Sequence, residues 1–181
     1  MKTRDMILIA LFAAMTAVGA FIRIPLGFST ITLQFLFTAL AGILLGAKLG
    51  ALSQAIYVLL GLVGVPIFAS GGGFQYVFNP TFGFLLGLIP TAWIIGALTK
   101  GDYAPKRVAL ACFAGLGVLY LIGVPYMGMI VNAYLGKGLT LWQILKSGMI
   151  IYLPGDCLKI AVCALVAPRL ARTLSHAEAG A

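Results

Sequence analysis

The chain has 181 residues, of which 62% are hydrophobic and only 9% are charged. Soluble domains contain roughly 45–50% apolar and about 25% charged residues, and a soluble domain of this length could not bury such an apolar excess. The composition therefore predicts an integral membrane protein. About six spans of roughly 20 residues would use most of these residues, which leaves no room among them for a soluble nucleotide-binding or catalytic domain.

The net charge of +8 does not indicate nucleic-acid binding, because the 12 Lys and Arg residues are scattered between apolar segments instead of forming one basic face. We expect them to determine membrane topology. The cysteines Cys112, Cys157 and Cys163 lie in apolar segments without metal-binding spacing, and the single His176 lies in a polar tail. We therefore expect neither a metal site nor a histidine-based catalytic triad.

Six apolar segments follow one another along the chain, and each predicts a transmembrane helix. They cover residues 6–22, 31–46, 49–64, 81–99, 108–135 and 144–168. The second and third are nearly contiguous and predict a tight helical hairpin. The fifth is long enough to tilt or to bend at Pro125, and Pro154-Gly155 interrupts the sixth. The expected fold is one all-α membrane domain over residues 1–181.

The basic residues between these segments orient the domain. With the N-terminus inside, eight fall on the cytoplasmic side and three on the opposite side, so the positive-inside rule predicts that both termini are cytoplasmic. The eight are Lys2, Arg4, Lys48, Lys100, Lys106, Arg107, Arg169 and Arg172, and the three are Arg23, Lys137 and Lys146.

Two connections lie on the outer side, at residues 24–30 and 65–80. The longer one is apolar and aromatic, has no charge, and contains three consecutive glycines at 71–73. An irregular apolar loop is expected to fold back over the helix ends, where its backbone finds partners in protein. It is either a lid over a cavity or a plain packed connector; we favour the lid, because glycines allow hinges and close approach.

Asp156 and Lys159 form the clearest candidate site. They lie three residues apart within an apolar segment and therefore share a helical face. A charged side chain at mid-membrane costs roughly 2.5–3.5 kcal/mol on insertion scales, so such residues usually face a cavity or a partner. The carboxylate could accept N–H donors from a solute, and the ammonium could hold an anionic group. The alternatives are a self-satisfied ion pair or a lysine that reaches the surface.

Further residues are candidates with open alternatives. Asn79 either contacts a solute or caps the fourth span, and Gln34 and Thr32 either line the same cavity or form interhelical hydrogen bonds. Aromatic residues and a loop glycine complete the candidate set, with packing or interface anchoring as the alternative for each aromatic residue. These are Gly73, Phe74, Tyr76, Tyr126 and Tyr152.

The first span carries small residues four apart on one flank, namely Ala10, Ala13, Ala14 and Ala17. This spacing permits close helix approach, either within the chain or against a partner, and the residues alone favour internal packing. The chain has no serine nucleophile elbow, zinc-binding His-Glu-x-x-His or complete phosphate loop. A membrane enzyme acting on lipid is therefore disfavoured, and any use of ATP requires another protein.

Several strings, taken in order, resemble BioY, the biotin-binding S component of energy-coupling factor (ECF) vitamin transporters. They are TITLQ at 30–34, LAGILLGAKLG at 40–50, YVLLGLVGVPIFA at 57–69, GGG at 71–73, PTFGFLLG at 80–87 and PGDCLK at 154–159. The resemblance implies a six-helix protein of a prokaryotic cytoplasmic membrane that captures biotin at its outer face. A carrier for another vitamin-like solute and a structural membrane protein are the alternatives.

The resemblance also implies partners and roles. The partners would be a transmembrane coupling subunit and two ABC-type ATPases, with biotin as the transported ligand and no cofactor. Asn79, Asp156 and Lys159 would contact the polar groups of biotin, the outer connections would cover it, and the alanine flank would dock on the coupling subunit.

Overall fold

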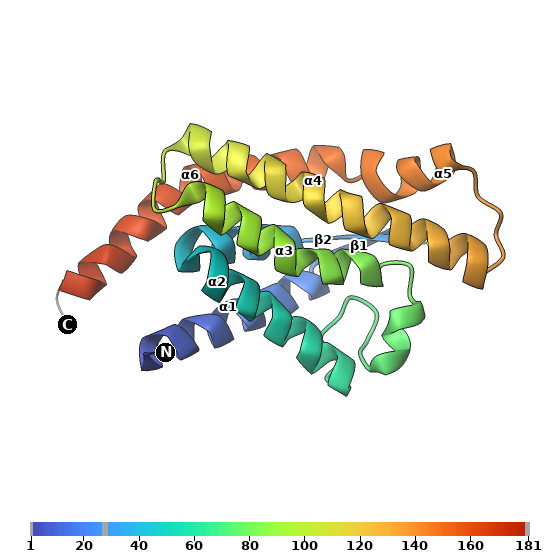
Figure 1. Ribbon diagram of the computed structural model, residues 1–181, viewed down its shortest axis with the longest axis horizontal. Helices are drawn as coiled ribbons and strands as arrows, with labels where there is room; N and C mark the ends of the chain where they lie inside the picture. Colours follow the sequence, from blue (N-terminus) through green and yellow to red (C-terminus); the bar gives the residue numbers. More distant parts are fainter. Residues whose placement is uncertain (1, 27–28, 180–181) are drawn as a thin grey trace.

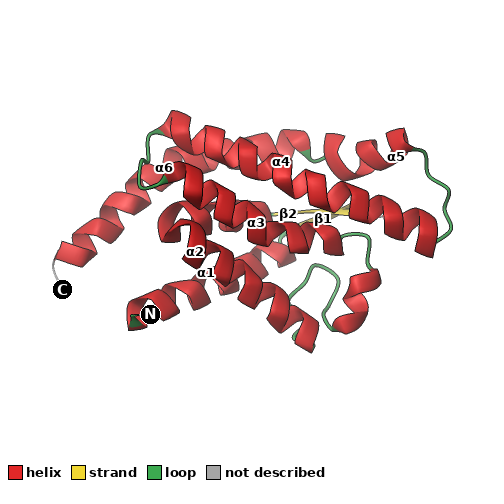
Figure 2. Ribbon diagram, in the orientation of Figure 1, coloured by secondary structure: helices red, strands yellow, loops and turns green. Residues whose placement is uncertain are grey.

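The computed structural model describes residues 2–26 and 29–179, without the side chains of Leu26, Ser29 and residues 172–179. Five helical stretches in these residues are long and apolar enough to cross a membrane. They are Thr3–Phe21 (α1), Gln34–Val63 (α2), Phe82–Thr99 (α3), Pro105–Tyr134, which begins with α4, and Leu141–Ala171, which includes α5 and most of α6. The described residues are mainly helical, as predicted, and their two strands form one small hairpin described below (Figure 2).

Helix α2 reverses direction at Gly46, whose backbone leaves the helical region at φ 78° and ψ 176°. Thr38 Oγ1 donates to Gln54 Oε1 at 2.9 Å, although these residues are 16 apart and would lie about 24 Å apart along a straight helix. A Cβ on Gly50 would lie 2.9 Å from Gly42 Cα, so only glycine permits this close crossing. Residues 34–45 and 47–63 therefore form the tight hairpin that the sequence predicts.

The exception to the helical fold is an antiparallel hairpin of β1 (Arg23–Leu26) and β2 (Ser29–Thr32), in which Ile24 pairs with Ile31. The prediction that a helix begins at Ile31 was therefore wrong. The β-branched run 30–32 favours extended backbone, which explains the difference. The predicted outer connection 24–30 also includes residues 27 and 28, which lie outside the described residues.

The C-terminal half is more broken than the sequence predicts. Helix α4 (Pro105–Met129) continues into a π-helical turn at Ile130–Tyr134. Helix α5 (Leu141–Leu145) is followed by another π-helical turn and then by α6 (Leu153–Ala179). Pro154 lies in the first turn of α6, where a missing N–H needs no partner, so it begins a helix and does not interrupt one.

The helices pack in a chain of neighbours, α1 on α2, α2 on α3 and α3 on α4, and α6 closes the bundle against α4 and α2. Both termini, the reversal of α2 and the α3–α4 connection lie toward one end of the bundle (Figure 1). The segment between α2 and α3 lies at the other end, with the α4–α5 connection. That segment contains η1, a short 3₁₀ helix at Phe74–Phe78.

Candidate functional site

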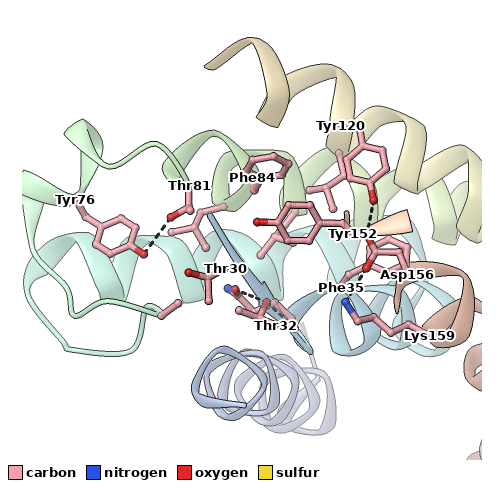
Figure 3. A pocket seen from close by; sticks show the side chains of 15 residues that line it. Thr30, Thr32, Phe35, Tyr76, Thr81, Phe84, Tyr120, Tyr152, Asp156 and Lys159 are labelled. Carbon is pink, nitrogen blue, oxygen red and sulfur yellow. Dashed lines mark hydrogen bonds and ion pairs between the residues drawn. The ribbon is translucent and has the colours of Figure 1, made fainter. Parts of the chain in front are cut away.

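A cavity lies between β2, the start of α2, the segment before α3, and helices α3, α4 and α6 (Figure 3). Centres of water-sized molecules can occupy about 70 Å³ of it. One buried water needs only roughly 10–15 Å³ on this measure, so the space suits a small molecule. It is lined by Thr30, Thr32, Gln34, Phe35, Ala69, Tyr76, Thr81, Phe84, Leu85, Leu88, Leu119, Tyr120, Tyr152, Asp156 and Lys159.

One end of the cavity holds a buried charged group, formed by Tyr120, Asp156 and Lys159. Lys159 Nζ donates to Asp156 Oδ1 at 2.6 Å, and Tyr120 Oη donates to Asp156 Oδ2 at 2.6 Å. Asp156 is 4% exposed and Lys159 is 7% exposed. Asp156 lies in the first turn of α6, where the helix dipole stabilises a negative charge. The Lys159 ammonium, the Tyr120 hydroxyl and the helix dipole therefore together stabilise the buried Asp156 carboxylate.

This pair is satisfied internally, yet it retains binding capacity. A carboxylate has roughly four lone-pair sites, and an ammonium has three N–H donors. Lys159 and Tyr120 use one site on each Asp156 oxygen, which leaves further sites able to accept N–H groups of a solute. The self-satisfied ion pair and the solute-binding pair are therefore compatible descriptions of the same geometry.

The opposite end of the cavity is polar but uncharged (Figure 3). Tyr76 Oη and Thr81 Oγ1 lie 3.3 Å apart in a hydrogen bond, and the Thr32 hydroxyl donates to Gln34 Oε1 at 2.9 Å. Thr30 adds a third threonine to this part of the lining. Hydroxyl and amide groups can donate to an anionic or carbonyl oxygen without the cost of burying another charge.

The middle of the cavity is aromatic and aliphatic. Phe84 and Tyr152 lie with ring centroids 6.2 Å apart, and Phe35 completes the aromatic lining. Leu85, Leu88 and Leu119 supply the aliphatic part. The cavity thus suits a small elongated solute with N–H donors at one end, an apolar centre and an oxygen-rich group at the other end.

Two segments cover the uncharged end. We call the two strands, residues 23–26 and 29–32, the hairpin cover and residues 65–78 the loop cover. The loop cover folds back over the helix ends, as predicted, because the Gly73 N–H donates to the Gly61 carbonyl at 2.7 Å and Tyr126 Oη donates to the Val77 carbonyl at 2.6 Å. Ala69 and Tyr76 of this cover line the cavity, which favours the lid over a plain connector.

The structure brings together six of the ten candidate residues in the cavity lining and leaves four outside it. The six are Thr32, Gln34, Tyr76, Tyr152, Asp156 and Lys159, and the four are Gly73, Phe74, Asn79 and Tyr126. Phe74 is 72% exposed, and Gly73, at φ 101°, forms the turn before η1. Asn79 neither lines the cavity nor caps the fourth span as expected: the residue before α3 is Thr81. Asn79 Oδ1 instead accepts the Thr81 N–H at 2.9 Å and the Thr81 hydroxyl at 2.8 Å, so it orients a lining residue.

Sequence reasoning missed Tyr120. A signal was available: a buried tyrosine hydroxyl usually finds a hydrogen-bond partner, and this one lies in the middle of an apolar helix. Thr81 and Phe84 were also missed, since a threonine before a helix and a phenylalanine within one are unremarkable in sequence.

The alanine flank of α1 divides between two environments. Ala13 is only 5% exposed and packs in the core, so this predicted docking residue is not on the surface. Ala17 is half-buried against the core, whereas Ala10 and Ala14 are exposed. The helical spacing of 3.6 residues turns positions 13 and 17 toward α2 and leaves positions 10 and 14 available to a partner.

Among the described side chains, those of residues 2–25 and 30–171, no three His, Cys, Asp or Glu residues gather into a possible metal site. All buried side-chain nitrogen and oxygen atoms of this described part have hydrogen-bond partners. The apolar helices and the buried amphiphilic cavity together define a membrane protein that binds a small solute.

Comparison with known proteins identifies the family. The BioY family model matches residues 1–176. A probable biotin transporter BioY of Lysinibacillus sphaericus is 41% identical over 181 residues, covering 98% of this chain and 92% of the relative. The biotin transporter BioY of Thermotoga maritima is 38% identical over 168 residues, covering 92% and 95%. The chain belongs to the BioY family, and it is a multi-pass membrane protein.

A solved structure agrees with this assignment. The S-component for biotin from an ECF-type ABC transporter superposes with a TM-score of 0.71 at 26% sequence identity. The match covers 95% of each chain. The chain therefore shares the fold of that S-component.

Proposed function

We propose that this protein is the biotin-capturing S component of an ATP-driven ECF importer. The observation that carries the proposal is the buried Tyr120–Asp156–Lys159 group at the end of an aromatic cavity. Relatives over nearly the whole chain are named biotin transporters, which supports biotin over other vitamin-like solutes.

The two ends of the cavity support one orientation of biotin. Its ureido ring has two N–H donors, which suit the remaining lone pairs of Asp156, and a carbonyl oxygen, which suits Lys159. Its fused rings and chain fit between Phe35, Phe84 and Tyr152. Its carboxylate would be repelled by Asp156 and belongs at the uncharged end, where the Thr30 hydroxyl and the second N–H of the Gln34 amide can donate to it.

The proposed topology has six membrane passes with both termini in the cytoplasm of a prokaryotic cell. The two halves of α2 then count separately, which raises the five apolar stretches to six passes. Residues 34–45 span only about 18 Å as a helix, less than the roughly 30 Å hydrocarbon core, so the hairpin cover would complete that pass. The eight-to-three distribution of basic residues supports this orientation.

The proposed partners are a transmembrane coupling subunit and two ABC-type ATPases, which would hydrolyse ATP in place of this chain. The solved neighbour is the S-component for biotin from an ECF-type ABC transporter, which supports ECF partners. On this chain, the exposed Ala10 and Ala14 of α1 offer a flank of small side chains on which another helix could pack closely.

The test is calorimetric titration of the purified chain with biotin, repeated with Asp156→Asn and Lys159→Ala. We expect saturable binding by the intact chain and a loss of at least about 100-fold in affinity in each variant, because removing one member of a buried charged pair leaves the other uncompensated. Thr91→Val is the matched control: Thr91 is fully buried and bonds to the Gly115 carbonyl at 3.1 Å, but it does not line the cavity. No saturable binding by the intact chain would refute biotin capture.

A further inference from the structure

A continuous series of hydrogen bonds joins the two covers through the protein interior. The Thr32 hydroxyl in the hairpin cover donates to Gln34 Oε1 at 2.9 Å. Gln34 Nε2 donates to Tyr57 Oη at 2.9 Å, and Tyr57 Oη donates to the Ile67 carbonyl of the loop cover at 3.0 Å. Residues that are 35 positions apart in the sequence are thus linked by three consecutive bonds of good length.

The middle of this series is shielded from water. Tyr57 is 0% exposed and Gln34 is 8% exposed. A buried hydrogen-bonding group that loses its partner costs considerably more than a surface group, because water cannot replace the bond. If one cover moves away, the buried Gln34 or Tyr57 side chain loses a hydrogen-bond partner. The remaining bonds of the series are then weaker, because hydrogen bonds in a chain strengthen one another.

An aromatic contact strengthens the link at the loop cover. Phe68, which is 0% exposed, lies edge-on to the Tyr57 ring with centroids 5.6 Å apart and packs on Tyr76 at 4.7 Å. The Phe68 ring lies directly on Gly61, where any Cβ would overlap it. Tyr57 therefore holds the loop cover both by its hydroxyl group and by its ring.

We propose that Gln34 and Tyr57 couple the two covers, so that the hairpin cover and the loop cover open and close over the cavity as one unit. Thr32 and Gln34 line the cavity, whereas Tyr57 does not. A solute that contacts Thr32 or Gln34 therefore acts on the loop cover through Tyr57. Tyr57 is a positioning residue: it holds the covers relative to each other and touches no solute.

The test is hydrogen exchange of the purified chain without ligand, measured separately for peptides from the two covers. Thr32→Val removes a hydroxyl group from the hairpin cover, and we expect exchange in residues 65–73 of the loop cover to rise about fivefold, as a loss of about 1 kcal/mol of coupling would produce. Tyr57→Phe keeps the ring against Phe68, and we expect faster exchange in both covers. Thr32→Ser retains the hydroxyl group and should restore the loop cover to its original rate.

Thr91→Val is again the matched control, because it removes one buried hydrogen bond between α3 and α4. Thr91→Val should leave the difference in hydrogen-exchange rate between the covers and the rest of the bundle unchanged. If Thr32→Val accelerates exchange only in the hairpin cover, the coupling is overturned. If Tyr57→Phe fails to fold, the Thr32→Val variant alone still decides the exchange experiment.

A second arm rests on the proposed function and measures biotin kinetics. Tyr57→Phe should raise the dissociation rate about tenfold and should also raise the association rate, because the uncoupled covers open more often. An unchanged dissociation rate would contradict the coupling. If the intact chain binds no biotin, the proposed function fails while the exchange measurement still decides whether the covers are coupled.

Discussion

The two ends of the cavity are built in different ways. The charged end is carried by residues of α4 and α6, two packed helices, and its two hydrogen bonds are both 2.6 Å long. The uncharged end is carried mostly by a short hairpin and an irregular loop, which are held by a few bonds to helix ends. A rigid charged end can supply affinity, while lightly held covers can admit and release a solute. Substitutions at the charged end should therefore mainly speed dissociation and lower affinity, whereas substitutions in the covers should speed both association and dissociation.

Asp156→Ala should have the largest effect. It leaves Lys159 buried without its carboxylate, and breaking such a pair typically costs about 3–5 kcal/mol. We expect biotin binding to disappear and the thermal midpoint of the detergent-solubilised chain to fall. Lys159→Met in the same chain should recover part of the midpoint but no binding, since it removes the unpaired charge. Detectable binding by Asp156→Ala would show that the charged end does not supply the affinity.

Tyr120→Phe should come next. It removes one hydrogen bond to a buried carboxylate, worth about 1.5–3 kcal/mol, and keeps the ring in place. The expected result is a loss of about 10-fold or more in affinity, mainly through faster dissociation, with no change in how the covers exchange hydrogen. Tyr126→Phe is the comparison, since its hydroxyl bonds to the Val77 carbonyl of the loop cover and not to Asp156. Equal affinities for Tyr120→Phe and the intact chain would remove Tyr120 from the site.

The charged end was more predictable from sequence than the covers. An Asp and a Lys three residues apart in an apolar segment can share a helical face, and burial cost then requires a partner or a cavity. Tyr120 was not predicted because it lies 36 residues before Asp156 on another helix, and local spacing in the sequence carries no information about the contact between them. Asn79 was predicted either to contact a solute or to cap the fourth span, but its side-chain oxygen accepts hydrogen bonds from the neighbouring Thr81.

The fold shows the same division. The reversal of α2 was predictable because a Gly and a Lys separate two apolar runs. The β-hairpin was not, because four-residue strands joined to apolar helices give almost no periodic signal. The start of α6 at Leu153 was also missed, because a Pro-Gly pair in an apolar run indicates a break and a helix start equally well.

Gly61→Ala tests the covers and should have a smaller effect on affinity than the changes at the charged end. The added methyl group meets the Phe68 ring and displaces it from its place beside Tyr57. We expect faster association and faster dissociation of biotin, with a modest net change in Kd. Gly117→Ala is the matched control, because a Cβ there meets no atom within 4 Å. A selective change in association and dissociation for Gly61→Ala, but not for Gly117→Ala, would support cover-controlled exchange; unchanged rates would contradict it.

Ala14→Leu should have the smallest effect on binding, because α1 contributes no residue to the cavity lining. Ala14 is exposed on α1, so leucine can be accommodated by the isolated chain but would separate a partner helix packed on that flank. We expect unchanged biotin affinity and strongly reduced uptake in cells that carry the proposed coupling subunit and ATPases. Ala114→Leu is the control for uptake, because Ala114 is an exposed alanine on α4, away from this flank. Normal uptake by Ala14→Leu would exclude this flank as the docking surface. A loss of biotin binding would instead mean that α1 supports the cavity from behind, and that affinity does not depend on the charged end and the lightly held covers alone.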